Sequence, residues 1–406
     1  MSTKKNLKRR DFIGNISKLS LFGVVGFQNT LNKEELNELA ANPEKGHEFL
    51  CTPYLQAPTT DSMTIMWITN KLCHSWIEYG EGNTINQKAQ SSSYGLVDAY
   101  NRINKIQLKN LIPNTQYSYK VFSKEIVKFD PYKISYGNTI ESEIKTFTTI
   151  NPKAESVSWL VMNDIHDRPK SITDLMLLNK EPYDYVFFNG DMFDYQTDEQ
   201  QIIDHMLKPC SEGFAQEKPF LFVRGNHETR GKFARNIHEY YASTSGKYFY
   251  AYQWGPVFTI VLDTGEDKPD NHNVYGGIVD FDAYREEQAR WFEKIAKSKE
   301  FKKAPFRVVM MHIPHYHSDE AHGTTHCRKL FAPLFNQYRI DLFLAGHTHK
   351  YGIYKENADH HYPIYIGGGP KNGNRTLIQV SANSKELNVK MLLDDGTTIG
   401  NTIIKK

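Results

Sequence analysis

The chain has 406 residues, and its content of 39% hydrophobic and 24% charged residues is ordinary for a globular protein. The net charge of +2 shows no strong basic or acidic balance, so we expect no nucleic-acid-binding domain. This length predicts two or three domains and a sizeable core.

The N-terminal segment has the composition of an export signal. Lys8, Arg9 and Arg10 belong to a basic region, and residues 19–27 form an apolar stretch that is too short to span a bilayer comfortably. Residues 8–13 resemble a twin-arginine signal, which carries proteins that are already folded.

We therefore interpret residues 1–30 as an export signal and residues 31–48 as a spacer, and we expect a periplasmic or cell-surface protein. The alternatives are a basic amphipathic helix and a retained N-terminal signal anchor. We expect no other transmembrane span.

Short strands are predicted from residue 49 to residue 150. Residues 63–67 and 117–121 alternate or nearly alternate apolar and polar side chains, and turn formers such as Pro113 separate the runs. This pattern predicts an antiparallel β-sandwich of about 100 residues. We expect its aromatic residues in the core and interfaces rather than on a carbohydrate-binding face.

The four cysteines, Cys51, Cys73, Cys210 and Cys327, have no CxxC spacing, which argues against a zinc ribbon. Buried free thiols are the commoner use of such residues. A disulfide between Cys51 and Cys73 is the alternative, since disulfides form in exported proteins.

After residue 150 the pattern changes to strands that alternate with helices. Residues 282–297 carry apolar side chains at mostly helical spacing and predict the clearest helix. Near the C-terminus, three segments return to strand patterns that close the sheet: residues 363–366, 375–380 and 387–393. We assign residues 151–406 to one α/β domain.

Five apolar runs of this domain each end in polar side chains that bind metals. The runs at residues 157–162, 183–188, 220–223, 307–311 and 342–345 lead into Asp164 and His166, Asp191, Asn226 and His227, His312, and His347 and His349, respectively. Ligand loops gather beyond the carboxyl ends of strands in α/β sheets. Carboxylate and imidazole ligands together suit Zn, Mn or Fe. The sequence therefore predicts a metal site with enough ligands for two ions.

The ordered motifs DxH, GDxxD, GNHE, a single histidine and GHxH resemble the metallophosphoesterase superfamily over residues 157–369. The resemblance implies a two-sheet αββα sandwich. It also implies that Asp164, His166 and His349 bind one metal ion, that Asn226, His312 and His347 bind the other, and that Asp191 bridges the two.

The resemblance implies hydrolysis by a metal-activated hydroxide, so no serine or cysteine nucleophile is required. His227 is expected to protonate the leaving alkoxide, and Asp194 is expected to orient His227 and raise its pKa. The alternative for His227 is simple packing beside the ligands.

Two further residues are predicted to bind substrate. Arg224 precedes GNHE, as in Ser/Thr phosphoprotein phosphatases, and its forked donors match phosphate oxygens. A structural ion pair is the alternative for Arg224. His315 belongs to a histidine-rich loop that we expect to overlook the cleft, and a merely solvated loop is the alternative.

The first domain is similar to the fibronectin type III-like domain that precedes the catalytic domain of purple acid phosphatases. The similar segments are residues 53–56, 62–67, 76–80 and 111–117. Purple acid phosphatases have a glycine where this chain has His166 and an iron-binding tyrosine where it has Asp194. We therefore expect their domain architecture without their tyrosinate-to-iron colour.

Together these features predict an exported phosphoesterase that uses two metal ions, Fe, Mn or Zn, to hydrolyse phosphate monoesters of small molecules. A phosphodiesterase or nucleotidase is the alternative activity. An inactive surface-binding module is disfavoured, because all seven predicted ligands are present. The oligomeric state stays open.

Overall fold

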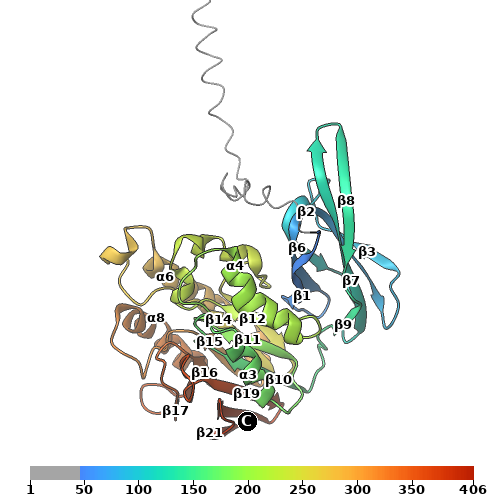
Figure 1. Cartoon of the computed structure of the whole chain (residues 1–406). Helices are drawn as coiled ribbons and strands as arrows, with labels where there is room; N and C mark the ends of the chain where they lie inside the picture. The colour runs from blue at the N-terminus through green and yellow to red at the C-terminus, as the bar shows by residue number, and fades with distance from the viewer. Residues whose placement is uncertain (1–45) are drawn as a thin grey trace, which may run out of the picture. The chain divides into compact units, whose positions relative to one another are not determined.

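The computed structural model describes residues 46–406 (Figure 1). The predicted export signal over residues 1–30 and most of the predicted spacer over residues 31–48 lie outside the described residues. Within residues 46–406, no helix combines the length and the apolar character needed to cross a membrane.

The first domain is built around two long antiparallel strands, β2 (Met63–Glu81) and β7 (Gln116–Asp130). The first part of β2 pairs with β1 (Phe49–Gln56) and β6 (Ala99–Leu108), and its second part pairs with β7 and β3 (Gln87–Ala89). The register between β2 and β6 shifts after Ile68. Such irregularities bend a strand, which allows one long strand to serve both halves of a sandwich.

The remaining strands of this domain are β4 (Ser92–Ser93), β5 (Leu96–Val97), β8 (Lys133–Glu141) and β9 (Lys145–Thr148). The domain's core includes Trp67, Tyr117 and Tyr119, which are almost completely buried. These three aromatic side chains are therefore core residues, as predicted. The fourth aromatic residue of the prediction, Trp76, is half-buried and stacks on Phe122 at 5.1 Å between ring centroids.

The second domain contains two six-stranded sheets. The first sheet has the order β12-β11-β10-β19-β20-β21, with β10 (Ser156–Met162), β11 (Tyr185–Asn189), β12 (Phe220–Val223), β19 (Thr376–Asn383), β20 (Glu386–Leu393) and β21 (Thr398–Lys405). The second has the order β13-β14-β15-β16-β18-β17, with β13 (Tyr250–Trp254), β14 (Val257–Leu262), β15 (Phe306–Met311), β16 (Leu342–Ala345), β17 (Gly352–Tyr354) and β18 (Ile364–Ile366).

The helices of the second domain flank these sheets (Figure 1). They are α3 (Lys170–Leu178), α4 (Glu199–Ile202), α5 (Lys208–Cys210), α6 (Phe281–Ile295), α7 (Lys299–Lys303) and α8 (His322–Tyr338). The helix predicted over residues 282–297 is α6.

Successive side chains of β10 lie in two different cores, which shows how the layers pack. Trp159 and Val161 lie in a core shared by the two sheets, whereas Leu160 and Met162 lie in a core that includes residues of α3 and α5. On the other outer face, Phe292 of α6 packs in one cluster with residues of α8 and the second sheet. Successive strand residues point to opposite faces, so both faces of each sheet are covered. The predicted αββα fold is confirmed.

The strands predicted to carry the ligands are β10, β11, β12, β15 and β16. Within the first sheet β10, β11 and β12 are parallel, and within the second sheet β15 and β16 are parallel. Parallel strands end at the same edge of their sheet, which brings their following loops together.

Strand β1 also packs against the second domain. Tyr54 donates a hydrogen bond from its hydroxyl group to the carbonyl of Tyr240 at 2.9 Å and stacks on Phe220 at 5.9 Å between ring centroids. Gln56 donates to the carbonyl of Phe220 at 2.9 Å. Residues 47–406 accordingly form one compact unit.

The four cysteines are all free and buried. Cys51 lies near Ser211, with 3.6 Å between Sγ and Oγ, and Cys73 lies near Thr69, with 3.5 Å between Sγ and Oγ1. The alternative of a disulfide between Cys51 and Cys73 is therefore wrong.

Because Tyr54 is buried in a core that both domains share, we expect the domains to unfold together. Tyr54→Ala should lower the free energy of unfolding by about 3–5 kcal/mol, the usual cost of removing a buried aromatic ring. Tyr54→Phe should cost only about 1 kcal/mol, because it keeps the ring and loses one hydrogen bond. Urea denaturation followed by circular dichroism measures both; a separate early transition that leaves the second domain folded would contradict the shared core.

Candidate metal centre

The structure brings six predicted ligands into two groups that share one residue. Asp164, His166, Asp191 and His349 form one group, and Asp191, His312 and His347 form the other. Within each group one ligand atom from each residue lies within 4.8 Å of all the others. The seventh predicted ligand, Asn226, places its Oδ1 atom 3.0 Å from Nδ1 of His347. Asp191 is the shared member, which is the position that the sequence predicted for a bridge.

The separations between ligand atoms suit shared ions. His312 Nε2 lies 3.0 Å from Asp191 Oδ2, and His349 Nε2 lies 2.9 Å from His166 Nε2 and 3.3 Å from Asp164 Oδ1. Two ligands that each lie about 2.1 Å from one ion are roughly 3 Å apart when they subtend a right angle at it.

His312 offers an independent test of this fit. Its Nδ1 atom is held by the carbonyl of Asn189 at 2.7 Å, and its buried Nε2 atom faces Asp191 Oδ2 at 3.0 Å. Metal-binding histidines typically use one ring nitrogen for the ion and bond the other to a carbonyl or carboxylate. In His312 the carbonyl fixes Nδ1 and directs Nε2 at the Asp191 carboxylate, which fits two ligands of one ion.

The carboxylates of the site are suited to cations. Burial opposes ionisation of Asp164, yet hydrogen bonds from His166 and His349 hold its pKa below the ordinary value. Burial also opposes ionisation of Asp191, and His312 holds the pKa of that carboxyl low. Two buried anionic side chains beside histidines form a donor set that suits Zn, Mn or Fe.

The backbone of the ligand loops is strained. The left-handed region is occupied by five ligands: Asp164 (φ 53°), His166 (φ 50°), Asp191 (φ 54°), His347 (φ 74°) and His349 (φ 54°). This region costs roughly 1–2 kcal/mol for a residue with a side chain. Strain of this kind collects at functional sites, where the surrounding structure fixes it.

Glycines allow the ligands to approach one another closely. Gly190 has φ +84°, and a Cβ atom there would lie 2.5 Å from His312 Nδ1. A Cβ atom at Gly225 would lie 2.1 Å from Asp191 Oδ1. Contacts this short are not tolerated, which explains the glycine before Asp191 and the glycine before Asn226.

His227 lies beside the ligand groups. Its ring is 4.7 Å from that of His166, and its Nε2 atom is 3.9 Å from Asp191 Oδ2. Its Nδ1 atom bonds to the backbone carbonyl of Asp194 at 2.5 Å. Burial lowers the pKa of the His227 imidazole.

Asp194 orients His227 as expected, and its hydrogen bond acts to raise the pKa of His227, but the group involved and the net direction of the pKa shift differ from the prediction. The Asp194 carboxylate lies 2.8 Å from Nδ1 of His166, so it orients His166, whereas only the backbone carbonyl of Asp194 orients His227. The pKa of His227 is lowered by burial rather than raised.

The two residues predicted to bind substrate lie elsewhere. Arg224 donates from Nε and Nη2 to Oδ2 of Asp263 at 2.8 and 2.6 Å, and its guanidinium covers the ring of Tyr248. This is the ion-pair alternative for Arg224.

His315 is fully buried, and its Nε2 atom lies 2.6 Å from the hydroxyl group of Tyr362. Burial lowers the pKa of the His315 imidazole. The prediction that His315 overlooks the cleft is therefore wrong, because the aromatic core beneath the loop takes up this side chain.

Sequence reasoning missed Glu228 and Arg230. The carboxylate of Glu228 is completely buried and accepts hydrogen bonds from the backbone N–H groups of Gly225, Asp191 and Met192 at 2.6, 2.9 and 2.6 Å. Arg230 places Nη1 3.1 Å from Nε2 of His227. Glu228 could have been found from the sequence, because it is the charged last residue of the GNHE motif.

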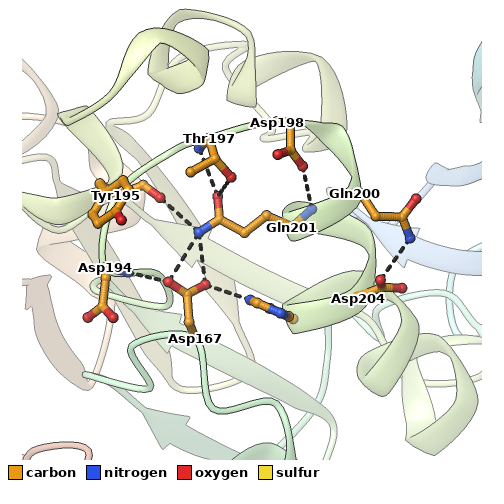
Figure 2. A pocket seen from close by; sticks show the side chains of 9 residues that line it. Asp167, Asp194, Tyr195, Thr197, Asp198, Gln200, Gln201 and Asp204 are labelled. Carbon is orange, nitrogen blue, oxygen red and sulfur yellow. Dashed lines mark hydrogen bonds and ion pairs between the residues drawn. The ribbon is translucent and has the colours of Figure 1, made fainter. Parts of the chain in front are cut away.

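An acidic pocket of about 420 Å³ opens beside Asp194 (Figure 2). Asp167 accepts hydrogen bonds there from Gln201 at 2.9 Å and from the backbone N–H of Asp194 at 2.8 Å. Tyr195 also lines this pocket and is 56% exposed, outside both ligand groups.

Comparison with known families agrees with this geometry. The model of the calcineurin-like phosphoesterase family matches residues 158–351, and that of the purple acid phosphatase N-terminal domain matches residues 52–149.

Curated relatives span most of the chain. Probable purple acid phosphatase 20 of Arabidopsis thaliana is 26% identical over 334 residues, which cover 76% of this chain and 71% of the relative. The purple acid phosphatase of Glycine max is 22% identical over 362 residues, which cover 83% of this chain and 70% of the relative.

Solved structures show the same fold. Purple acid phosphatase PPD1 from yellow lupin (Lupinus luteus) has a TM-score of 0.66 at 16% identity, and the match covers 87% of this chain and 74% of that one. A structure of PhoD has a TM-score of 0.61 at 12% identity, with 88% of each chain covered.

The family models, the relatives and the two ligand groups lead to the same conclusion. The chain has a dinuclear metal centre whose metal identity is not determined by its ligands. It is a metal-dependent phosphoesterase that contains a purple acid phosphatase N-terminal domain over residues 52–149, followed by a calcineurin-like phosphoesterase domain over residues 158–351.

Proposed function

We propose that this chain is an exported phosphatase that hydrolyses phosphate monoesters of small molecules. The observation that carries the proposal is the pair of ligand groups that share Asp191. Relatives named as phosphatases, including phosphoenolpyruvate phosphatase of Allium cepa at 25% identity over 261 residues, favour monoesters. The basic and apolar segments at the N-terminus support export.

The seven ligands have the roles that their geometry favours. Asp164, His166 and His349 would hold one ion, Asn226, His312 and His347 would hold the other, and Asp191 belongs to both ligand groups. When bound, the two ions supply Lewis-acid activation of the phosphoryl group and of the attacking water.

His227 is the proposed proton donor to the leaving group. The carbonyl of Asp194 fixes Nδ1, so Nε2 points toward the ligand groups and is the atom that carries the transferable proton. Arg230 donates to this atom from Nη1 at 3.1 Å. A phosphate dianion beside His227 favours its protonated form, and Arg230 is then free to bind phosphate oxygens.

Glu228 holds the bridging residue in place. Its carboxylate accepts from the backbone N–H groups of Asp191 and Gly225 and thereby ties the loop after β11 to the loop after β12. Since Asp191 belongs to both ligand groups, its position sets how the two groups lie relative to each other. Glu228 is a positioning residue that acts through Asp191.

The first test compares an aryl phosphate monoester with the matching diester, with metal content measured on the same sample. We expect about two metal ions per chain and a higher kcat/KM for the monoester. Asp191→Asn should reduce turnover by more than about 100-fold, because removing a direct ligand costs more than removing a partner that only orients one. A preference for the diester would replace the monoester assignment, and full activity of Asp191→Asn would remove the proposed centre.

His227→Ala should slow an alkyl phosphate by about 10²- to 10⁴-fold, the usual contribution of a general acid. A 4-nitrophenyl ester, whose leaving group needs little protonation, should be slowed much less. His361→Ala changes an exposed histidine and serves as the control. Equal losses for the two esters in His227→Ala would show that His227 does not act as the acid.

Glu228→Gln should lower the free energy of unfolding by about 1–3 kcal/mol, because one backbone N–H group then faces an amide N–H₂ group in a buried site. The same variant should retain fewer metal ions after dialysis against a weak chelator. Glu293→Gln on the exposed side of α6 is the matched control. Unchanged stability together with unchanged metal content would mean that Glu228 does not hold the bridge.

A further inference from the structure

We infer that the leaving group of the substrate binds in a basic pocket next to His227 and carries an anionic group beside an apolar surface. This inference rests on the proposed phosphatase function and adds the class of ester. The basic pocket has a volume of about 530 Å³. Its lining includes four cationic and two exposed apolar residues: Arg230, Lys232, Arg235, Lys268, Val274 and Ile278.

The basic pocket is continuous with the metal-ligand loop. Arg230 lines the pocket and contacts Nε2 of His227 at 3.1 Å. Thr229 also lines it and donates from Oγ1 to the carbonyl of the ligand Asn226 at 2.8 Å. The oxygen that receives a proton from His227 is the oxygen of the leaving group, so the rest of the leaving group lies on this side.

The only acidic side chain that lines the basic pocket is already paired. Glu266 is 1% exposed, and its two oxygens accept from Arg230 Nε and Nη2 at 2.9 Å each and from the hydroxyl group of Tyr275 at 3.0 Å. Lys268 pairs with Asp267 at 2.9 Å between Nζ and Oδ1. Carboxylates therefore neutralise two of the four cations.

Lys232 and Arg235 supply the unneutralised charge. Both are exposed, and neither pairs with a carboxylate in the described part of the chain; Arg235 donates only to the carbonyl of Ile278 at 3.2 Å. Two cations without acidic partners at the edge of a pocket attract an anionic ligand.

Two apolar residues of the basic pocket indicate that the leaving group also has an apolar surface. Val274 and Ile278 are each 66% exposed and lie on the same pocket as the free cations. A single exposed apolar residue needs no explanation, but two that face one pocket beside an active site match a ligand with its own apolar surface. An aryl or short-chain leaving group that carries a carboxylate fits both features.

The acidic pocket beside Asp194 is a poor site for an anionic leaving group. The acidic pocket beside Asp194 is lined by four aspartates, Asp167, Asp194, Asp198 and Asp204, together with His205 (Figure 2). An anionic leaving group is repelled there and attracted on the side of Lys232. A cationic leaving group would show the reverse preference.

The test compares three aryl monoesters that differ in one substituent: phenyl phosphate, 3-carboxyphenyl phosphate and 3-(aminomethyl)phenyl phosphate. The wild-type protein should hydrolyse the carboxylated ester with a kcat/KM about tenfold higher than that of phenyl phosphate, which corresponds to about 1.4 kcal/mol. The advantage should appear mainly in KM. It should shrink as salt is raised, because exposed charges are screened.

Lys232→Met combined with Arg235→Met should reduce the carboxylate advantage at least fivefold. Arg290→Met combined with Lys302→Met removes two exposed cations outside the basic pocket and should leave the advantage unchanged. Val274→Ser combined with Ile278→Ser should lower kcat/KM for phenyl phosphate relative to ethyl phosphate.

Three results would overturn the inference and leave the phosphatase activity standing. They are equal kcat/KM values for the phenyl and carboxyphenyl esters, a preference for the aminomethyl ester, and a carboxylate advantage that survives loss of Lys232 and Arg235. Failure to hydrolyse any of the three monoesters would instead overturn the proposed function, and the inference with it.

Discussion

The position of Asp191 is the constraint on which the rest of the site depends, because one carboxylate belongs to both ligand groups. Its backbone is left-handed, its N–H group is held by Glu228, and Gly225 leaves room for its Oδ1 atom. Two sheets, rather than one, are therefore needed: β11 carries Asp191, and β15 of the second sheet carries His312, which faces it.

The packing of the fold stabilises the strained backbone of the ligand loops. Five ligands with positive φ cost several kcal/mol in total at roughly 1–2 kcal/mol each. The strands that precede them are fully buried between layers, as the burial of β11 and β16 shows. Their packing and their parallel ladders fix both ends of each loop, so the loop cannot relax without disrupting the core. The same arrangement holds the Nε2 atom of His312 3.0 Å from Asp191 Oδ2.

Features that depend on the order of apolar and polar residues along the chain were predicted from the sequence. The five ligand-bearing strands, α6 and the convergence of the ligands followed from apolar runs that end in polar residues. What it could not predict depends on side chains that meet across loops. Arg224 finds Asp263, which is 39 positions away, and His315 is taken up by an aromatic core that includes Tyr362. No sequence motif links Arg224 to Asp263 or His315 to Tyr362.

Exposure explains why Arg230, and not Arg224, is available to substrate. Both guanidinium groups are paired with a carboxylate, but the side chain of Arg224 is 14% exposed and its partner Asp263 is completely buried. Withdrawing Arg224 would leave an unpaired buried charge, which is strongly destabilising. The side chain of Arg230 is 30% exposed, and it keeps Nη1 directed at His227 while Nε and Nη2 hold Glu266. One donor of Arg230 can therefore turn to an incoming phosphate without breaking the ion pair that anchors it.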